Sequence, residues 1–324
     1  MNYFNKKASI LFGITLGFFV TPTVVNSCAI NDLPEAGTQE KNTICHTPNE
    51  FKDYIIFEKD LRYITDISSK IDLYEDCNNT AWYVRPKRFY EVDKNIFAVV
   101  VSNILKHLSP ETFIPVKFVI GTEEDGETKV IGTASQKTDF VSLSSYILDH
   151  IPYKSETEEA WRGRVQSMED MYQKTYGAEK QYTFWMYLGF PVPSSQHSGI
   201  LKNGQVIRVD YGNAFRSARS FEWLGEEKPE LLEKNCFQAE PFQLESHSCD
   251  INVMKGLYLY IISNTSNAAI SKLVSKPFEV LKELNISNIS FGYQSAIENY
   301  LKDSRNNILA LLSNSLTSPI DIQK

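Results

Sequence analysis

Residues 197–215 read His-Ser-Gly-Ile-Leu-Lys-Asn-Gly-Gln-Val-Ile-Arg-Val-Asp-Tyr-Gly-Asn-Ala-Phe, and they carry the clearest structural signal in the chain. Two apolar runs flank Asn203-Gly204, a dipeptide that favours a tight two-residue turn between antiparallel strands. We therefore predict a β-hairpin over residues 200–209. The hairpin delivers an acid, Asp210, which an aromatic residue and Gly212 follow at once.

This arrangement of residues matches the chemistry of phosphoryl transfer. That reaction needs a carboxylate at a fixed strand end to hold Mg²⁺ between phosphates, and a loop group that positions the acceptor. Asp210 is the candidate for the carboxylate, and Gly212 would let the backbone turn sharply away from the metal. His197, in the polar loop before the hairpin, is the candidate catalytic base near neutral pH. The alternative is that Asp210 only caps a turn and that His197 only binds backbone groups.

The first half of the chain alternates strands with one helix. Ala81–Pro86 is strand-like and ends at a proline, and apolar residues from Phe97 to Leu108 then recur at helical spacing. Two further strands are expected over Phe113–Gly121 and Lys129–Thr133, with a polar turn between them at residues 123–127. The predicted order is strand, helix, strand, turn, strand.

The second half is predicted to be mostly helical, apart from the hairpin. The expected helices cover Ser144–His150, Glu156–Tyr176, Gln181–Leu188, Val253–Ser263, Ala268–Leu284 and Tyr293–Leu316. Gly177 separates the second of these helices from the third. The expected fold class is therefore α+β.

At residues 197–212 the chain resembles the kinase superfamily, in particular atypical members such as phosphoinositide-kinase-like and aminoglycoside-phosphotransferase-like enzymes and the kinase-like effectors of intracellular bacteria. In that family a His-containing catalytic loop, a hairpin and an Asp-aromatic-Gly turn follow one another. The resemblance implies a two-lobed α+β fold with ATP between the lobes. The smaller, β-rich N-lobe would cover residues 51–143, and the larger helical C-lobe would cover residues 144–324.

The resemblance also implies roles for single residues. Arg85 or Lys87 would replace the lysine that contacts phosphate in the family; the alternative is that both are solvated charges next to a strand end. Glu91, just before the following helix, is a candidate to pair with them across the cleft. Asp210 would bind Mg²⁺, and His197 would orient or deprotonate the acceptor.

The chain departs from the family at two catalytic positions. Ser194-Ser195-Gln196 stand where the family has a catalytic aspartate, and Gly199-Ile200 stand where it has a metal-binding asparagine. Two functions therefore stay open. The first is an ATP- and Mg²⁺-dependent phosphotransferase with an unknown acceptor, and the second is an inactive pseudokinase or another exported binding protein.

The N-terminus has the layout of an export signal. Two lysines precede an uncharged, mostly apolar stretch over residues 8–25, and the small residues that follow suit cleavage after Ala29. We expect residues 1–29 to be removed and residues 30–50 to be a polar linker. The chain would then work in a periplasm, outside the cell or inside a host. A permanent membrane anchor and lipid attachment at Cys28 are the alternatives.

Charge and cysteine content narrow the partners and the compartment. The net charge of −7 and the lack of a long Lys/Arg run argue against nucleic acid as a partner. A nucleotide, or a host or periplasmic protein or lipid, remains, and no membrane span is expected after signal cleavage. The mature chain would keep Cys45, Cys77, Cys236 and Cys249, which permit three disulfide pairings in an exported protein. Cys236 and Cys249 are the favoured local bridge.

Overall fold

The structure is a computed structural model of the chain, and it describes residues 45–68, 71–86, 92–122, 126–142, 156–173, 176–190, 198–215, 238–239, 242–243, 251–286 and 288–317. These residues all belong to one compact unit, Thr43–Lys324. Several features expected from the sequence lie outside the described residues: the export signal over 1–29, Cys28, Lys87, Glu91, the helix Ser144–His150, His197, Cys236 and Cys249.

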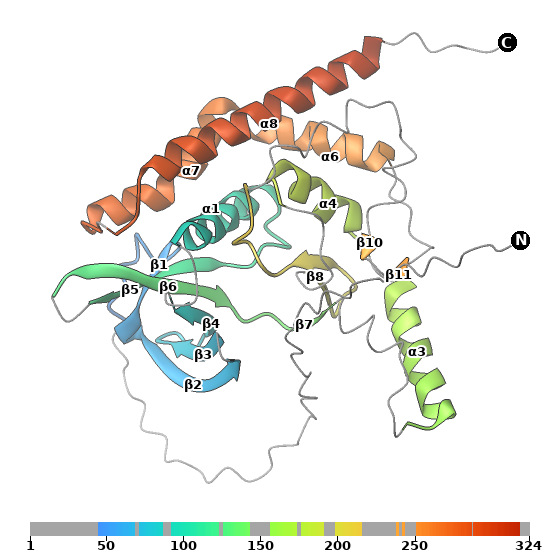
Figure 1. Cartoon of the computed structure of the whole chain (residues 1–324), viewed down its shortest axis with the longest axis horizontal. Coiled ribbons are helices and arrows are strands. Elements are labelled where there is room, and N and C mark those ends of the chain that lie inside the picture. The colour runs from blue at the N-terminus through green and yellow to red at the C-terminus, as the bar shows by residue number, and fades with distance from the viewer. Residues whose placement is uncertain are drawn as a thin grey trace, which may run out of the picture. The chain divides into compact units, whose positions relative to one another are not determined.

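The fold is mixed α+β, with a six-stranded mixed sheet near the N-terminus and helices that mostly follow it (Figure 1). The sheet has the order β1-β5-β6-β4-β3-β2, and β1 pairs parallel with β5 while the other neighbours are antiparallel. A short 3-10 helix, Glu58–Asp60, joins the first two strands. The strands are β1 (Ile55–Phe57), β2 (Leu61–Ser68), β3 (Ile71–Asp76), β4 (Ala81–Pro86), β5 (Val116–Thr122) and β6 (Thr128–Gln136).

The predicted order of strand, helix, strand, turn and strand is confirmed from β4 to β6, with helix α1 (Val92–Leu108) after β4. Strands β1, β2 and β3 were not predicted. Residues 62–68 of β2 are all exposed, so that strand lacks the alternation of apolar and polar residues that marks a half-buried strand. Its pairing with β3 is also irregular, with register shifts after Tyr63 and after Asp66.

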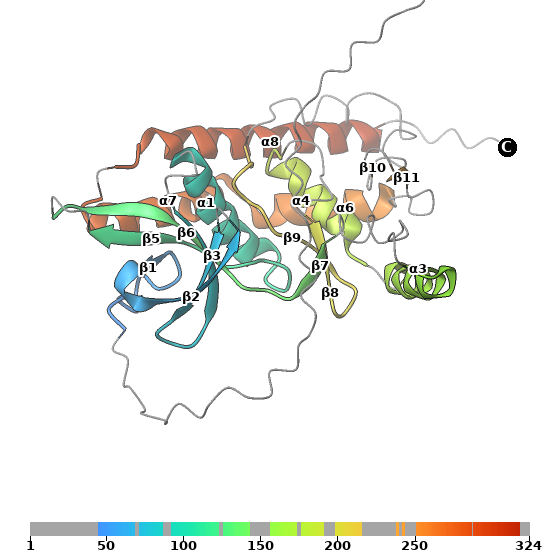
Figure 2. The same cartoon turned by 60° about the horizontal axis from the view of Figure 1, so that its bottom comes forward.

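Helix α1 is the centre of the core. It contacts β5 and β6 on the sheet and also helix α7 (Asn267–Glu283), so nearly every residue from Asn95 to Leu105 is buried (Figures 1 and 2). The Asn103 side-chain amide donates a hydrogen bond to the Leu273 carbonyl of α7 at 2.7 Å. The apolar spacing correctly predicted the helix. Its burial by α7 as well as by the sheet arises from the tertiary structure.

The remaining helices agree with the predicted segments to within a few residues at each end. They are α3 (Glu158–Gln173), α4 (Ala178–Tyr187), α6 (Ile251–Asn264), α7 (Asn267–Glu283) and α8 (Gly292–Thr317). Gly177, with φ of 82°, precedes α4 and separates it from α3 as expected, because glycine adopts the left-handed conformation without a Cβ penalty. Within the described residues, none of the helices has the length and apolar character needed to cross a membrane.

The predicted hairpin is present as β8 (Ser198–Leu201) and β9 (Val206–Arg208), joined through Asn203 and Gly204. Gly204 has φ of 89°, and the Asn203 side-chain oxygen accepts a hydrogen bond from the Gln205 amide at 3.0 Å. Strand β7 (Phe140–Ser142) extends the hairpin to three strands by pairing with β8. A second short pair is formed by β10 (Gln238–Ala239) and β11 (Phe242–Gln243).

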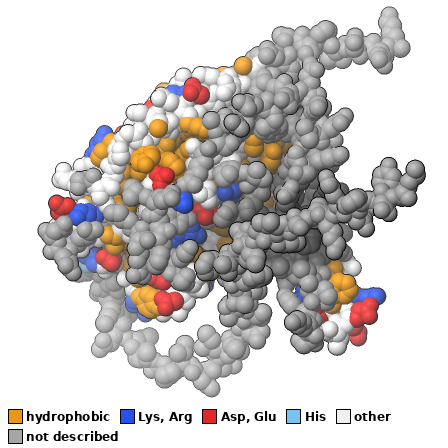
Figure 3. All heavy atoms as spheres, viewed as in Figure 1, with side chains coloured by type: hydrophobic (Ala, Val, Ile, Leu, Met, Phe, Trp, Pro, Cys, Tyr) orange, Lys and Arg blue, Asp and Glu red, His pale blue; other side chains and the backbone are white. Residues whose placement is uncertain are grey.

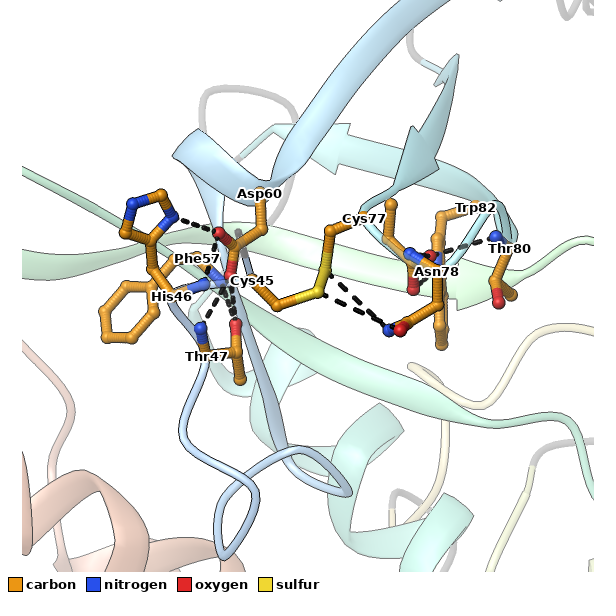
Figure 4. The surroundings of a disulfide bond; sticks show 10 residues. Cys45, His46, Thr47, Phe57, Asp60, Cys77, Asn78, Thr80 and Trp82 are labelled. Carbon is orange, nitrogen blue, oxygen red and sulfur yellow. Dashed lines mark hydrogen bonds and ion pairs between the residues drawn. A yellow bond between two sulfur atoms is a disulfide. The ribbon is translucent and has the colours of Figure 1, made fainter. Parts of the chain in front are cut away.

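The N-terminal end of the described chain is fixed to the sheet by a disulfide between Cys45 and Cys77 (Figure 4). Residues 45–50 fall within the range expected as a linker. Of the three pairings open to the four mature cysteines, the one that contains this bond also joins Cys236 to Cys249.

Beside the disulfide, the carboxylate of Asp60 receives hydrogen bonds from His46 and Thr47, which fix the same segment (Figure 4). Across the face of the molecule in Figure 3, basic and acidic side chains of the described residues are interspersed.

Candidate functional site

Two residues that the sequence analysis assigned to one site, Arg85 and Asp210, lie in contact. Arg85 is near the end of β4, and Asp210 follows β9, so the two are 125 residues apart in sequence. Arg85 Nη1 lies 3.5 Å from Asp210 Oδ2. The Asp210 side chain is 10% exposed, whereas the Arg85 side chain is 30% exposed. The pair therefore joins the six-stranded sheet to the hairpin at a place that solvent still reaches.

The turn that carries Asp210 is fixed by hydrogen bonds on both sides. The Gly212 amide donates to Asp210 Oδ1 at 3.0 Å, which closes an Asx-type turn. The hydroxyl of Tyr211 accepts a hydrogen bond from the amide of Ile114, just before β5, at 2.9 Å. Burial raises the pKa of Tyr211, so its hydroxyl stays protonated at neutral pH. The position of the Asp210 carboxylate is thus set by its own turn and by the sheet.

The structure adds a buried arginine, Arg208, that the sequence analysis did not assign to the site. Arg208 is only 2% exposed, and its Nε donates to the Asp210 carbonyl at 2.9 Å. Its guanidinium carbon lies 3.9 Å from the ring centre of Phe190 and 5.0 Å from that of Trp185. Nη1 has no hydrogen-bond partner within the described part of the chain. An arginine in a short strand is more simply interpreted as a solvated residue, so only the fold reveals its burial.

The Arg208 guanidinium stays charged in spite of its burial. Burial lowers its pKa to about 10, while the negative charge of Asp210 opposes this shift. A pKa of about 10 still leaves the guanidinium protonated at neutral pH. The two aromatic faces compensate part of the lost hydration by cation–π attraction. Asp210 therefore has a second cation close to it, the buried guanidinium that donates to its carbonyl.

Replacing Arg208 by lysine is expected to destabilise the protein by about 1–2 kcal/mol. Lysine keeps the charge but loses the planar stack on Phe190 and the Nε hydrogen bond to Asp210. Urea unfolding measures the effect. The matched control is Arg162→Lys, which alters an exposed ion pair with Glu158 on α3 and should stay within about 0.5 kcal/mol. Equal effects of the two substitutions would contradict the structural role given to Arg208.

A pocket of about 210 Å³ lies beside this pair and has Arg85 on its wall. Its volume is below the roughly 300–1,000 Å³ typical of sites that enclose a whole small molecule, so it suits one ring system or part of a ligand. Ser135, Gln136 and Thr138 supply polar groups on the wall. The apolar lining residues are Ile67, Ile71, Tyr83, Ile114, Phe140 and Val209.

The described residues supply only part of the magnesium site that the resemblance implies. Both carboxylate oxygens of Asp210 already have partners, Gly212 and Arg85. A Cβ added at Gly199, in the family's metal-binding position, would lie 2.3 Å from a ring carbon of Phe140. Among the residues that the structure describes, no group of three His, Cys, Asp or Glu side chains could hold a metal ion.

Of the five residues assigned to the site from the sequence, Arg85 and Asp210 are brought together. Lys87, Glu91 and His197 lie outside the described residues, so their assignments stay predictions. Beyond Arg208, the structure adds Phe140 and Tyr211, which shape the pocket wall and the turn. An aromatic after an acid was visible in the sequence, but its contact with Ile114 was not.

Comparisons with known proteins leave the family open. No protein-family model and no curated protein matches the chain. Among solved structures, the chain is similar to the N-terminal 618-residue fragment of LepB from Legionella pneumophila, with 10% sequence identity and a TM-score of 0.43. The match covers 73% of this chain and 46% of that fragment, so the chain spans less than half of its length. We draw nothing about function from a match at this score.

Proposed function

We propose that the chain is an exported, kinase-like protein whose pocket beside Arg85 and Asp210 binds a nucleotide, and that it acts as a binding protein of the pseudokinase type. The observation that carries the proposal is the contact between Arg85 and Asp210, which come from segments 125 residues apart and meet beside a pocket. A cation next to a partly apolar pocket suits a ligand with a flat ring and an anionic group.

Binding is favoured over catalysis by the residues around the hairpin. Ser194-Ser195-Gln196 supply no carboxylate where the related enzymes have their catalytic aspartate, and Gly199 supplies no metal ligand. Transfer of a phosphoryl group needs both a group that positions the acceptor and compensation of the developing charge. The Cys45–Cys77 disulfide supports export, because such bonds persist mainly in oxidising compartments.

An active phosphotransferase is the second candidate, and the position of Asp210 directly after a strand and beside Arg85 favours it. It would bind ATP with Mg²⁺ held by Asp210 and would use His197 on the acceptor. This candidate requires Mg²⁺-dependent consumption of ATP that Asp210→Ala abolishes.

We expect ATP to raise the melting temperature of the wild-type chain in Mg²⁺-containing buffer. A ligand at 100 times its dissociation constant adds about 2.7 kcal/mol to stability, which corresponds to a shift of roughly 5 °C for a domain of this size. Arg85→Ala should remove most of the shift. The matched control is Arg62→Ala on β2. Arg62 is an exposed arginine of the same sheet, and it forms an ion pair with Glu75. An unchanged melting temperature of the wild type at millimolar ATP would refute the proposed function.

A further inference from the structure

We propose that this pocket holds the phosphate groups of its nucleotide directly through Arg85, without a divalent metal ion. This inference rests on the proposed nucleotide binding and specifies how the anionic part of the ligand is recognised. The resemblance implies that Asp210 binds Mg²⁺. In this proposal Asp210 instead pairs with Arg85 and accepts the hydrogen bond that closes its turn.

The carboxylate of Asp210 is already committed to protein groups. Oδ1 accepts the Gly212 amide at 3.0 Å, and Oδ2 lies 3.5 Å from Arg85 Nη1. Mg²⁺ requires oxygen ligands at about 2.0–2.1 Å in near-octahedral geometry. To bind at Asp210 it would have to share Oδ2 with the positive charge of Arg85, or share Oδ1 with the amide of the turn that the Tyr211 hydroxyl fixes against Ile114. The first arrangement places two cations on one carboxylate oxygen, which weakens the binding of each.

The electrostatics of the turn also disfavour a divalent cation. Two guanidinium groups act on Asp210, because Arg85 contacts its carboxylate and the buried Arg208 donates to its carbonyl and interacts with its negative charge. Arg208 is held in place, because its Nε donates a hydrogen bond to the Asp210 carbonyl and its guanidinium stacks on the ring of Phe190. These two positive charges offset the attraction of one carboxylate for Mg²⁺.

A second protein ligand for the metal is missing where the related enzymes have one. Gly199 is buried in β8 against the ring of Phe140, and that ring occupies the space that any side chain would need. Magnesium in phosphate sites is usually bound by one or two carboxylates together with the phosphates themselves. Within the described residues, the hairpin thus provides one carboxylate, and that one is engaged.

Arg85 has the properties of a direct phosphate ligand. Its side chain is 30% exposed and lines the pocket. Its 3.5 Å contact with Asp210 is longer than the roughly 2.7–2.9 Å of a strong charge-assisted hydrogen bond. The planar fork of arginine binds two phosphate oxygens at once, which lysine does not. A bound phosphate would therefore compete with Asp210 for Arg85.

The test is isothermal titration calorimetry of the full chain with ATP and with adenosine, each in buffer that contains Mg²⁺ and in buffer that contains EDTA. We expect the dissociation constant of ATP in EDTA to stay within about threefold of its value in Mg²⁺, and adenosine to bind at least about tenfold more weakly than ATP. Arg85→Gln should weaken ATP binding by about tenfold or more. Asp210→Asn keeps an acceptor for Gly212 but removes the charge that competes for Arg85, so it should bind ATP in EDTA several-fold more tightly. Asp66→Asn, an exposed carboxylate on β2 bonded by Tyr63, is the matched control.

The outcomes separate the two proposals. ATP binding that needs Mg²⁺ and is lost in Asp210→Asn would overturn the metal-free mode and leave the nucleotide site standing. Absence of ATP binding in both buffers would overturn the proposed function and this inference with it. Because the comparison of Mg²⁺ with EDTA uses wild-type protein, it decides the question even where a variant does not fold.

Discussion

Removal of the Cys45–Cys77 disulfide, by Cys45→Ser, Cys77→Ser or both, is expected to lower the free energy of unfolding by about 3–4 kcal/mol. The bond closes a loop of 32 residues, and the chain-entropy model gives about 3.7 kcal/mol at 25 °C for a loop of this length. It crosslinks the segment before β1 to the turn between β3 and β4. The open loop gives the unfolded chain more conformations, so the equilibrium shifts toward unfolding.

Guanidinium unfolding of the oxidised protein and of the variants measures this loss. The two single variants and the double variant should give nearly the same value, because each of them removes the same bond. Agreement among the three variants would show that the loss comes from the missing bond and not from a local effect of serine at position 45 or 77. A loss below about 1 kcal/mol in all three would contradict a stabilising crosslink at this site. Mass analysis of unreduced peptides would report the bond directly.

Asp60→Asn is expected to cost about 2–3 kcal/mol at neutral pH. The Asp60 side chain is fully buried and accepts four hydrogen bonds. They come from the His46 amide at 2.9 Å, His46 Nδ1 at 2.7 Å, the Thr47 amide at 2.7 Å and Thr47 Oγ1 at 2.6 Å. An asparagine amide turns its NH₂ group toward some of these donors, so buried polar groups lose their partners. Urea unfolding measures the difference.

The same residue gives an acid-dependent contribution to stability. Burial alone would raise the pKa of Asp60, but hydrogen bonds from Thr47 and His46 outweigh it and hold the pKa below its usual 3.8. A carboxyl with a depressed pKa in the folded state stabilises fully above its unfolded pKa of about 3.9, and this is lost as the pH falls through the folded value. The gap between wild type and Asp60→Asn should therefore be constant above about pH 5 and narrow below about pH 4.

The control for this prediction is Asp53→Asn, which alters an exposed pair with Lys106. Surface ion pairs contribute about 0–1 kcal/mol, so that variant should stay close to wild type over the whole pH range. A gap between wild type and Asp60→Asn that persists undiminished at pH 2 would show that the buried charge is not its source. Glu111 and Glu298 also have lowered pKa values, so only the difference between variants isolates Asp60.

Local sequence patterns determined most of the regular elements. The spacing of apolar residues located α1, α4 and α7, and Asn203-Gly204 located the hairpin β8–β9. These signals can be recognised because each depends on residues that are close in sequence. Helical burial repeats every 3.6 residues, and the loop of the hairpin has a left-handed residue at Gly204, where glycine is favoured. Strand β2 was not predicted, because its exposed residues do not alternate between apolar and polar side chains.

The sequence by itself also singled out Asp210, through its place after a hairpin, and Arg85, through the resemblance to the kinase superfamily. Only the tertiary structure decided that the two meet, that Arg208 is buried beside them, and that Cys45 pairs with Cys77. The physical reason is that periodicity records which face of an element is buried and not which distant element buries it. Contacts across 32 or 125 residues are selected by the packing of the whole core, after the loop-closure entropy of every intervening segment has been overcome.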